Sequence, residues 1–296
     1  IRQRTSKPVN VNFFCHRPAV PDPEREAGWR ARLAPYYAEL GIDPAAPIPA
    51  ANRAPFDDAF CAVVEEFRPE VVSFHFGLPT PELLDRVKAT GARVVSSATT
   101  ADEARWLEDH GADAIIAQGN EAGGHRGIFL TDDIANQPGL FALLPQVVDA
   151  VEVPVIAAGG IGDARGIVAA FALGASAVQL GTAYLFTPEA MITPMHREAL
   201  KTAKDDGTAL TNLFTGRPAR GLVNRLMREV GPLSADAPAF PTAGGALMPL
   251  KAKAEASGSA DFSSLWSGQA AALGREMGAG DLTRQLWTEV LERLRS

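Results

Sequence analysis

A repeated unit of strand, short loop, helix and glycine constrains this chain more than any other feature of its sequence. The unit recurs with a short period between residues 69 and 186. Its strand-length runs are rich in Val and Ile and mostly lack polar/apolar alternation, which is typical of strands covered on both faces. The runs are Val9–Phe14, Val71–Gly77, Ala92–Ala98, Ala112–Gly119, Pro154–Gly160 and Ala175–Thr182. This pattern predicts an α/β fold with a parallel sheet.

Three of the intervening helices carry matched start and stop residues. Each begins after a Thr or Asp that can cap its first turn, and each ends at a glycine that can adopt the left-handed conformation of a helix end. The pairs are Thr80 and Gly91, Thr100 and Gly111, and Asp163 and Gly174. Because these boundaries are short-range features, they support the βα repeat independently of its hydrophobic pattern.

Two α/β architectures compete for this pattern. A doubly wound sheet with a dinucleotide site needs G-x-G-x-x-G after its first strand and an acid about 20 residues later. The chain instead has GGIGDARG at 159–166, late in the sequence and without that acid. In a (β/α)₈ barrel, functional residues lie on loops at the carboxyl ends of the strands, and glycines and polar residues gather there in this chain. We therefore expect a TIM-type barrel, incomplete because six parallel strands are recognisable.

The remaining segments predict a division into two parts. Residues 1–203 should form the barrel portion, with a proline-rich insertion at 17–55 around an amphipathic helix. Residues 204–296 should form an extension of helices and irregular chain packed on the barrel. Its last two helices are expected at Leu265–Met277 and Asp281–Arg295.

Composition excludes several functional classes. The chain has 296 residues, 46% hydrophobic content and a formal net charge of −7, and it lacks a basic run of the kind that binds nucleic acid. We expect no membrane span, because no apolar run approaches about 18 residues. The acidic balance favours a cytoplasmic protein. Cys15 and Cys61 lack metal-ligand spacing and are expected to be reduced thiols, so we expect no metal site.

Glycine-rich strand ends predict a phosphate site. GGIGDARG follows the strand VPVIAA, and its backbone N–H groups can point at an anion. The next strand ends in QLGTAYL, where Gly181 and Thr182 offer further donors. The last two βα loops of this barrel commonly bind phosphate. The alternative is a pair of tight strand–helix turns without a ligand.

Three amide side chains lie at strand ends: Asn12, Gln118 and Gln179. A buried amide needs partners at both its ends. These side chains either hydrogen-bond to neighbouring backbone or contact the polar edge of a flat heterocycle, and the sequence leaves both interpretations open.

His125 is the strongest candidate for catalysis. It follows two glycines in AQGNEAGGHRG, so its backbone can approach a ligand closely. An imidazole with an ordinary pKa near 6.5 suits proton abstraction at neutral pH, and the alternative is a plain loop histidine. His75 also lies at a strand end, between aromatic residues, where it is equally compatible with a satisfied core residue. His110 lies near a helix end and needs no functional explanation.

Several motifs together resemble the nitronate monooxygenase family, formerly called 2-nitropropane dioxygenases. They are AQGNEAGGHRG, AAGGIGDARGIVAAFALGASAVQLGTAYL and LWSGQAA, with VNVNFF and VVSFHFGLP as matching strands. The resemblance extends from Pro8 to about Arg275 and implies an FMN-dependent TIM barrel. It also implies that His125 is catalytic. The residues implied to contact FMN are Asn12, Gln118, Gly123, Gly160, Gln179, Leu180, Gly181 and Thr182.

The resemblance implies a specific reaction. In this family a nitronate gives an electron to FMN, O₂ reoxidises the flavin, and the products are a carbonyl compound and nitrite. His125 would deprotonate a neutral nitroalkane, or hold the anionic nitronate when the imidazole is charged. The physiological nitro compound and the oligomeric state stay open.

One departure from the family pattern leads to a structural expectation. Family members begin with two further βα units that this sequence lacks, so we expect a gap in the barrel wall and exposed apolar residues on the strands that flank it. Two other functions therefore remain open. One is a flavin-dependent enoyl-acyl-carrier-protein reductase using NAD(P)H, which LWSGQAA disfavours; the other is a non-catalytic flavin-binding fragment.

Overall fold

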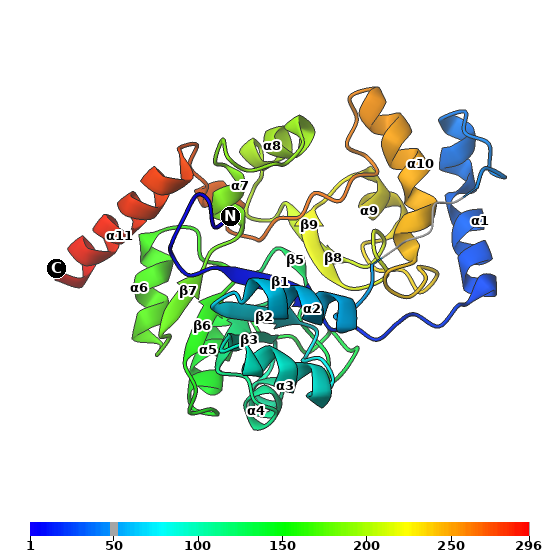
Figure 1. Cartoon of the computed structure of the whole chain (residues 1–296). Coiled ribbons are helices and arrows are strands. Elements are labelled where there is room, and N and C mark those ends of the chain that lie inside the picture. The colour runs from blue at the N-terminus through cyan, green and yellow to red at the C-terminus, as the bar shows by residue number, and fades with distance from the viewer. Residues whose placement is uncertain (48–52, 296) are drawn as a thin grey trace.

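The computed structural model describes residues 1–47 and 53–295, and its centre is a six-stranded parallel sheet. The strands follow one another in chain order, each hydrogen-bonded to the next (Figure 1). They are β1 (Asn10–Phe14), β2 (Val71–His75), β3 (Arg93–Ala98), β4 (Ala114–Gln118), β6 (Val155–Ala158) and β7 (Ala177–Gln179). The predicted six parallel strands are therefore confirmed, and the sheet is curled like part of a barrel wall.

Helices cover the outer face of this sheet. The central strands carry fully buried residues such as Val72, Val94 and Ile115, because the helices shield them from water. The covering helices are α2 (Asp58–Phe67), α3 (Pro81–Ala89), α4 (Ala101–Asp109), α5 (Leu140–Val148) and α6 (Ala164–Ala172). The main core lies between α4, α5, α6 and the strands β4 and β6. This packing explains why the strands read as continuous apolar runs.

Local sequence explains where these helices begin and end. Thr100 and Asp163 accept hydrogen bonds from the first-turn N–H groups of α4 and α6, as predicted. Thr80 precedes α3 without a side-chain cap. The glycines expected at the three helix ends have φ values of 88°, 97° and 96°, which residues with a Cβ rarely adopt.

The sheet is open between its first and last strands, as expected. In the described residues, β1 pairs only with β2, and β7 pairs only with β6. The apolar residues on β1 are half-buried, whereas those on the central strands are fully buried. An apolar groove of about 530 Å³ runs beside β1, and two of its lining residues on α2, Val63 and Phe67, are 44% and 64% exposed. The expected exposure thus falls mainly on the helix beside the gap.

A second, antiparallel sheet was not predicted. It joins β5 (Gly124–His125), β9 (Ala219–Leu222) and β8 (Thr208–Thr211), in that order. The expectation of only helices and irregular chain in 204–296 is therefore wrong for the segment that contains β8 and β9. Strands of four residues carry too little periodicity to be recognised in a sequence. The sheet matters because it joins the glycine-rich loop to a segment nearly 100 residues further along the chain.

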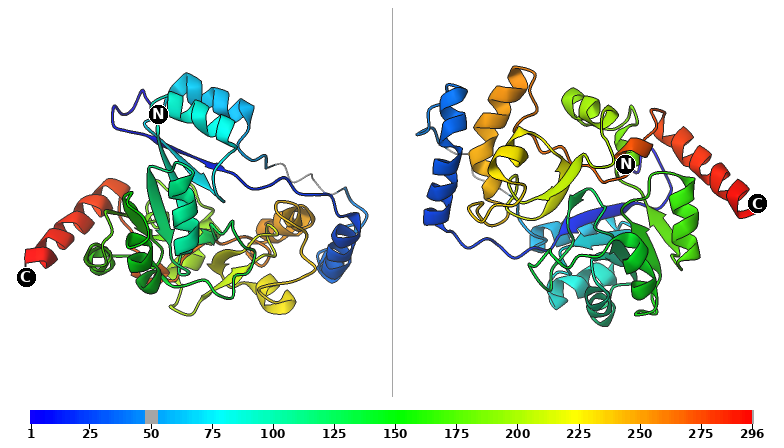
Figure 2. Two further views of the ribbon diagram at one scale, coloured as in Figure 1. Left: turned by 90° about the horizontal axis from the view of Figure 1, so that it is seen from below. Right: turned by 180° about the vertical axis from the view of Figure 1, so that it is seen from behind.

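Helix α1 (Pro23–Glu39) packs against α10 (Ala243–Ala256), and the two lie side by side in Figures 1 and 2. The buried indole of Trp29 donates to Ala243 O, and the Tyr37 hydroxyl donates to Ala246 O. The proline-rich insertion thus forms a second core with the C-terminal extension rather than with the sheet. Residues 48–52 of that insertion lie outside the described residues. The division at residue 203 stays a prediction.

The end of the chain returns to the barrel. The helix expected at Leu265–Met277 is wrong: only the short 3₁₀ helix η1 (Ala271–Leu273) forms there, and Trp266 bridges to Gly221 of β9 instead. Helix α11 (Ala279–Arg295) confirms the last predicted helix and packs on α6. The other helices are α7 (Thr182–Leu185), α8 (Pro194–Lys201) and α9 (Arg225–Val230). Across residues 1–47 and 53–295, no helix is long and apolar enough to cross a membrane.

Adjacent positions on α11 provide a matched test of this packing. Leu286 is 4% exposed in the main core, whereas Trp287 is 55% exposed. Leu286→Ala should lower the free energy of unfolding by about 2–5 kcal/mol because it leaves a cavity. Trp287→Ala should change it by about 0.5 kcal/mol or less. Urea unfolding measures both, and equal effects would show that α11 does not pack on the core as described.

Candidate active site

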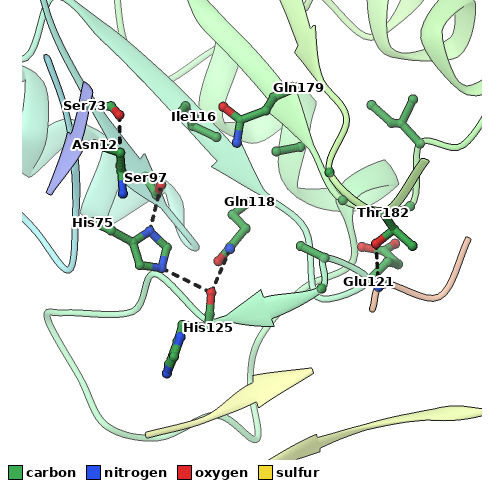
Figure 3. Close-up of a pocket in the computed structure, with 18 of the residues that line it drawn as sticks. Asn12, Ser73, His75, Ser97, Ile116, Gln118, Glu121, His125, Gln179 and Thr182 are labelled. Atoms are coloured by element: carbon green, nitrogen blue, oxygen red, sulfur yellow. Dashed lines mark hydrogen bonds between the residues drawn. The ribbon is translucent and has the colours of Figure 1, made fainter. Parts of the chain in front are cut away.

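A cavity of about 370 Å³ opens at the carboxyl ends of the parallel strands (Figure 3). Nearly all the predicted site residues line it, as expected if parallel strands bring their ends to one edge. These residues are Asn12, Gln118, Gly123, His125, Gly160, Gln179, Gly181 and Thr182. Leu180 does not line the cavity, because its side chain packs against the main core. Any contact it makes with a ligand must come from its backbone.

The glycine-rich loop is shaped by close approach and by pairing. A Cβ on Gly123 would lie 2.5 Å from the backbone nitrogen of Gly268, so no larger residue fits there. Gly124 has a φ of 75°, which favours glycine. Gly124 and His125 then pair with Arg220 and Ala219 of β9. The glycines therefore let the loop pass under the C-terminal segment and present His125 to the cavity.

A fully buried arginine holds the base of this loop. The Arg126 guanidinium donates to Gly119 O at 2.5 Å, to Gln118 O at 2.9 Å and to Gln137 Oε1 at 3.0 Å. Burial lowers the pKa of Arg126 to about 10, so the group stays charged at neutral pH. Its hydrogen bonds close the turn after β4. Because Arg126 directly follows His125, they also fix the chain next to the histidine.

The carbonyl of His125 is held from two sides. Gln118 Nε2 donates to it at 3.0 Å, and His75 Nε2 lies 3.2 Å away (Figure 3). Gln118 Oε1 accepts from the N–H of Gly127 at 2.7 Å, and His75 Nδ1 lies 3.1 Å from Ser97 Oγ. Gln118 therefore uses both amide ends on the loop, which favours the backbone-bonding interpretation for this residue. His75 lines the cavity as part of the same network.

The imidazole of His125 is enclosed by aromatic rings. The ring centroids of Phe14, Phe76, Phe240 and Trp266 lie 5.4–5.9 Å from it. Phe76 has a φ of 70°, a costly conformation for a bulky residue that tends to occur at functional sites. The guanidinium of Arg217 stacks 4.1 Å from the Phe76 ring. Phe76 thus contacts both the imidazole of His125 and the guanidinium of Arg217.

The surroundings make this histidine a neutral group. Burial lowers the pKa of His125 to about 3, and the neighbouring basic groups His75, Arg53, Arg217 and His16 add to the effect. Burial likewise lowers the pKa of His75 to about 4. The expected ordinary pKa near 6.5 is therefore wrong for His125, because aromatic walls replace water around the ring. The imidazole can accept a proton at neutral pH but is not charged there.

The other side of the cavity fits a flat anionic cofactor. In the described chain, the N–H groups of Gly160, Ile161 and Gly181 donate to no protein acceptor. A Cβ on Gly181 would meet nothing within 4 Å, so open space adjoins these donors. Thr182 Oγ1 accepts from Gly268 N at 2.9 Å, which leaves its own hydrogen free to donate. These groups can hold a phosphate without help from a cation.

Amide side chains on neighbouring strand ends complete this side. Asn12 Oδ1 accepts from Ser73 Oγ at 2.9 Å, so its amide nitrogen keeps both hydrogens for a ligand. The backbone of Gln179 pairs with β6, but its side chain makes no hydrogen bond within the described residues. Both side chains line the cavity and can meet the polar edge of a heterocycle.

Sequence reasoning missed several residues of the site, and three of them bear directly on its chemistry. Glu121 lines the cavity, and its carboxylate accepts from the N–H of Leu140 at the start of α5. Its place in NEAGG was the only hint. Thr215 Oγ1 lies 3.0 Å from His125 Nε2, and Phe76 carries the backbone strain. No local pattern marks Thr215, because the β8–β9 turn reaches the site only through tertiary structure.

Comparison with known proteins identifies the family. The family model described as Nitronate monooxygenase matches residues 1–289. The chain belongs to the nitronate monooxygenase family. A nitronate monooxygenase of Pseudomonas aeruginosa is 44% identical over 292 residues, which are 98% of this chain and 83% of that protein. Membership places the chain among oxidoreductases and implies a flavin cofactor.

Solved structures agree with this family. The nitroalkane oxidase of Streptomyces ansochromogenes matches with a TM-score of 0.87 at 40% identity, covering 98% of this chain and 82% of that chain. FabK of Thermotoga maritima matches with a TM-score of 0.67 at 27% identity, covering 99% and 79%. The likeness to the first extends through both the barrel portion and the C-terminal part.

Because His75 and His125 are neutral in the folded protein, its stability should depend on pH. Between pH 6.5 and about 4, the unfolded chain protonates both histidines while the folded chain does not. The free energy of unfolding should therefore decrease as pH falls, by up to about 1.4 kcal/mol per unit for each histidine. Urea unfolding from pH 7 to pH 4.5 measures the slope. His125→Asn should flatten it, and an unchanged slope in that variant would contradict the cause.

Proposed function

We propose that this chain is an FMN-dependent nitronate monooxygenase that oxidises alkyl nitronates and nitroalkanes with O₂ to a carbonyl compound and nitrite. The proposal is supported by one cavity that has His125 in its wall (Figure 3) and is also lined by Gly160, Ile161 and Gly181, whose N–H groups lack a protein acceptor among the described residues. The family and the nitroalkane oxidase of Streptomyces ansochromogenes agree with this chemistry. The expected cytoplasmic location stays a prediction.

The FMN phosphate is assigned to the loops 159–161 and 180–182, because Gly160, Ile161 and Gly181 line the cavity and their N–H groups have no protein acceptor among the described residues. Asn12, Gln179 and the backbone of Gly123 lie along the rest of the cavity wall and would hold the ring system. When bound, the flavin supplies the redox chemistry, accepting electrons from the nitronate and passing them to O₂. The protein's own contribution is orientation, exclusion of water and the handling of one proton.

His125 is assigned the proton of a neutral nitroalkane. Its uncharged imidazole would accept the proton from the carbon that bears the nitro group. An imidazole with a pKa near 3 is a weak acceptor, so preformed nitronates should react faster than neutral nitroalkanes. For a nitronate, the same ring confines the substrate without offering a positive charge, which revises the expectation that a charged imidazole holds the anion.

The comparisons do not favour an enoyl reductase. The family model named for nitronate monooxygenases spans 1–289, including the LWSGQAA segment. That segment passes directly over the glycine-rich loop, where a Cβ on Gly123 would lie 2.6 Å from Ser267 C. An inert flavin-binding fragment is the alternative that the next experiments address.

Gly181→Asp tests the cofactor. Gly181 has a φ of −105° and open space at its Cβ, so an aspartate fits the fold and places a carboxylate beside the phosphate. The variant should lose FMN, whereas Gly181→Ala should keep it. Gly160 is a poorer position, because its φ of 68° strains any side chain.

Flavin absorbance of the purified proteins and titration with FMN and riboflavin measure the effect. FMN should bind more tightly than riboflavin to the unaltered chain, and Gly181→Asp should abolish this difference. Normal FMN occupancy in Gly181→Asp would contradict the phosphate assignment.

His125→Asn tests the proton acceptor. The kcat/KM for a neutral nitroalkane should fall about 10²–10⁴-fold, the usual contribution of a general base, and that for its nitronate should fall less. Both are measured from pH 6 to pH 9, where the unaltered protein should show no imidazole titration. Equal losses for the two forms would mean that His125 positions the substrate, and no loss would remove it from the mechanism.

A further inference from the structure

The imidazole of His125 has one hydrogen-bonding side chain beside it in the described residues. Its Nε2 lies 3.0 Å from Oγ1 of Thr215. Thr215 stands in the turn between β8 and β9, in the C-terminal part of the chain, and reaches the histidine because β5 pairs with β9. The group that touches the active histidine therefore comes from outside the barrel portion.

The hydroxyl of Thr215 has a second neighbour, the carbonyl oxygen of Arg217, which can only accept a hydrogen bond. The hydroxyl donates to Arg217 O at 3.2 Å, and the N–H of Arg217 donates back to Oγ1 at 3.4 Å. A hydroxyl has a single hydrogen and two lone pairs, so the side that faces the imidazole is an acceptor. In this arrangement His125 Nε2 carries the ring hydrogen and donates, which leaves the lone pair on Nδ1.

The rest of the environment gives this ring little freedom. The His125 carbonyl is held by Gln118 and His75, and aromatic rings surround the imidazole. Nδ1 has no partner among the described residues, and His125 lines the cavity. Nδ1 is thus the ring nitrogen left to meet a ligand.

We propose that Thr215 is a positioning residue that holds His125 as its Nε2–H tautomer and presents Nδ1 to the substrate. The role in turnover rests on the proposed function; the tautomer itself does not. The ionisable groups that act on the imidazole are Arg53, Arg217, His16 and His75, all of them basic. An uncharged threonine orients the ring in this setting without the gain in basicity that a carboxylate partner would give.

The tautomer is measured directly in the full chain by ¹⁵N NMR of the histidine side chains. The spectrum of His125→Asn identifies the signals of His125. In the unaltered protein, Nε2 should be protonated and Nδ1 unprotonated at pH 7. Thr215→Val, which keeps the volume and removes the acceptor, should give a mixture of tautomers, and Thr215→Ser should restore the single form. A protonated Nδ1 in the unaltered protein would overturn the proposal.

Kinetics then test the role of the tautomer. Thr215→Val should lower kcat for a neutral nitroalkane about tenfold or more, with a smaller change for the nitronate and with KM nearly unchanged. Thr215→Ser should recover most of the rate. A loss that Thr215→Ser does not recover, or no loss at all, would overturn the positioning role.

Two controls separate the possible failures. Thermal unfolding of Thr215→Val shows whether this variant is still folded. If it is not, the NMR spectra of the unaltered protein and of Thr215→Ser are the decisive measurements. If no nitro compound is oxidised by the unaltered protein, the proposed function fails while the tautomer assignment is still tested. If nitronates are oxidised but the tautomer is wrong, only Thr215 loses its role.

Discussion

The pairing of β5 with β9 is the interaction on which the site depends. It fixes the main chain of Gly124 and His125, while Gln118 and His75 hold the His125 carbonyl from the side of the barrel. The loop is therefore fastened to both parts of the chain. Its glycines are needed because the segment around Gly268 crosses at contact distance. Without this double attachment, the histidine would sit on a mobile loop and could not keep a fixed geometry toward a ligand.

The electrostatics of the site follow from the burial of His125 among aromatic side chains. Aromatic rings replace water around His125, and the nearby charges that act on it are basic. The imidazole is consequently neutral, and its partner Thr215 is uncharged. Such a site fixes the orientation of the imidazole without raising its proton affinity. The anion-binding capacity lies elsewhere in the cavity, in backbone N–H groups that need no counter-charge. Strain at Phe76 is consistent with a structure that accepts a local cost for a fixed aromatic wall.

Much of the barrel portion was predictable because its features are local. The apolar runs, the caps at Thr100 and Asp163 and the helix-ending glycines each depend on a few neighbouring residues. Parallel pairing then brings the strand ends together, so most candidate site residues were named correctly as neighbours. The wrong predictions concern segments whose structure depends on long-range contacts. Residues 265–277 have helix-like composition, but the segment bridges to β9 instead of forming a helix, since tertiary contacts outweigh weak propensities.

The sequence by itself determined the parallel sheet, the family and the edge at which its functional residues gather, because hydrophobic period and glycine position are written along the chain. Only the tertiary structure decided the state of those residues. Gln118 binds the loop at both ends, and His125 is neutral because groups from distant segments surround it. Thr215 reaches the imidazole across 90 residues of sequence. Burial and long-range contacts set the pKa and the tautomer of a side chain, and neither property can be recognised from a local sequence pattern.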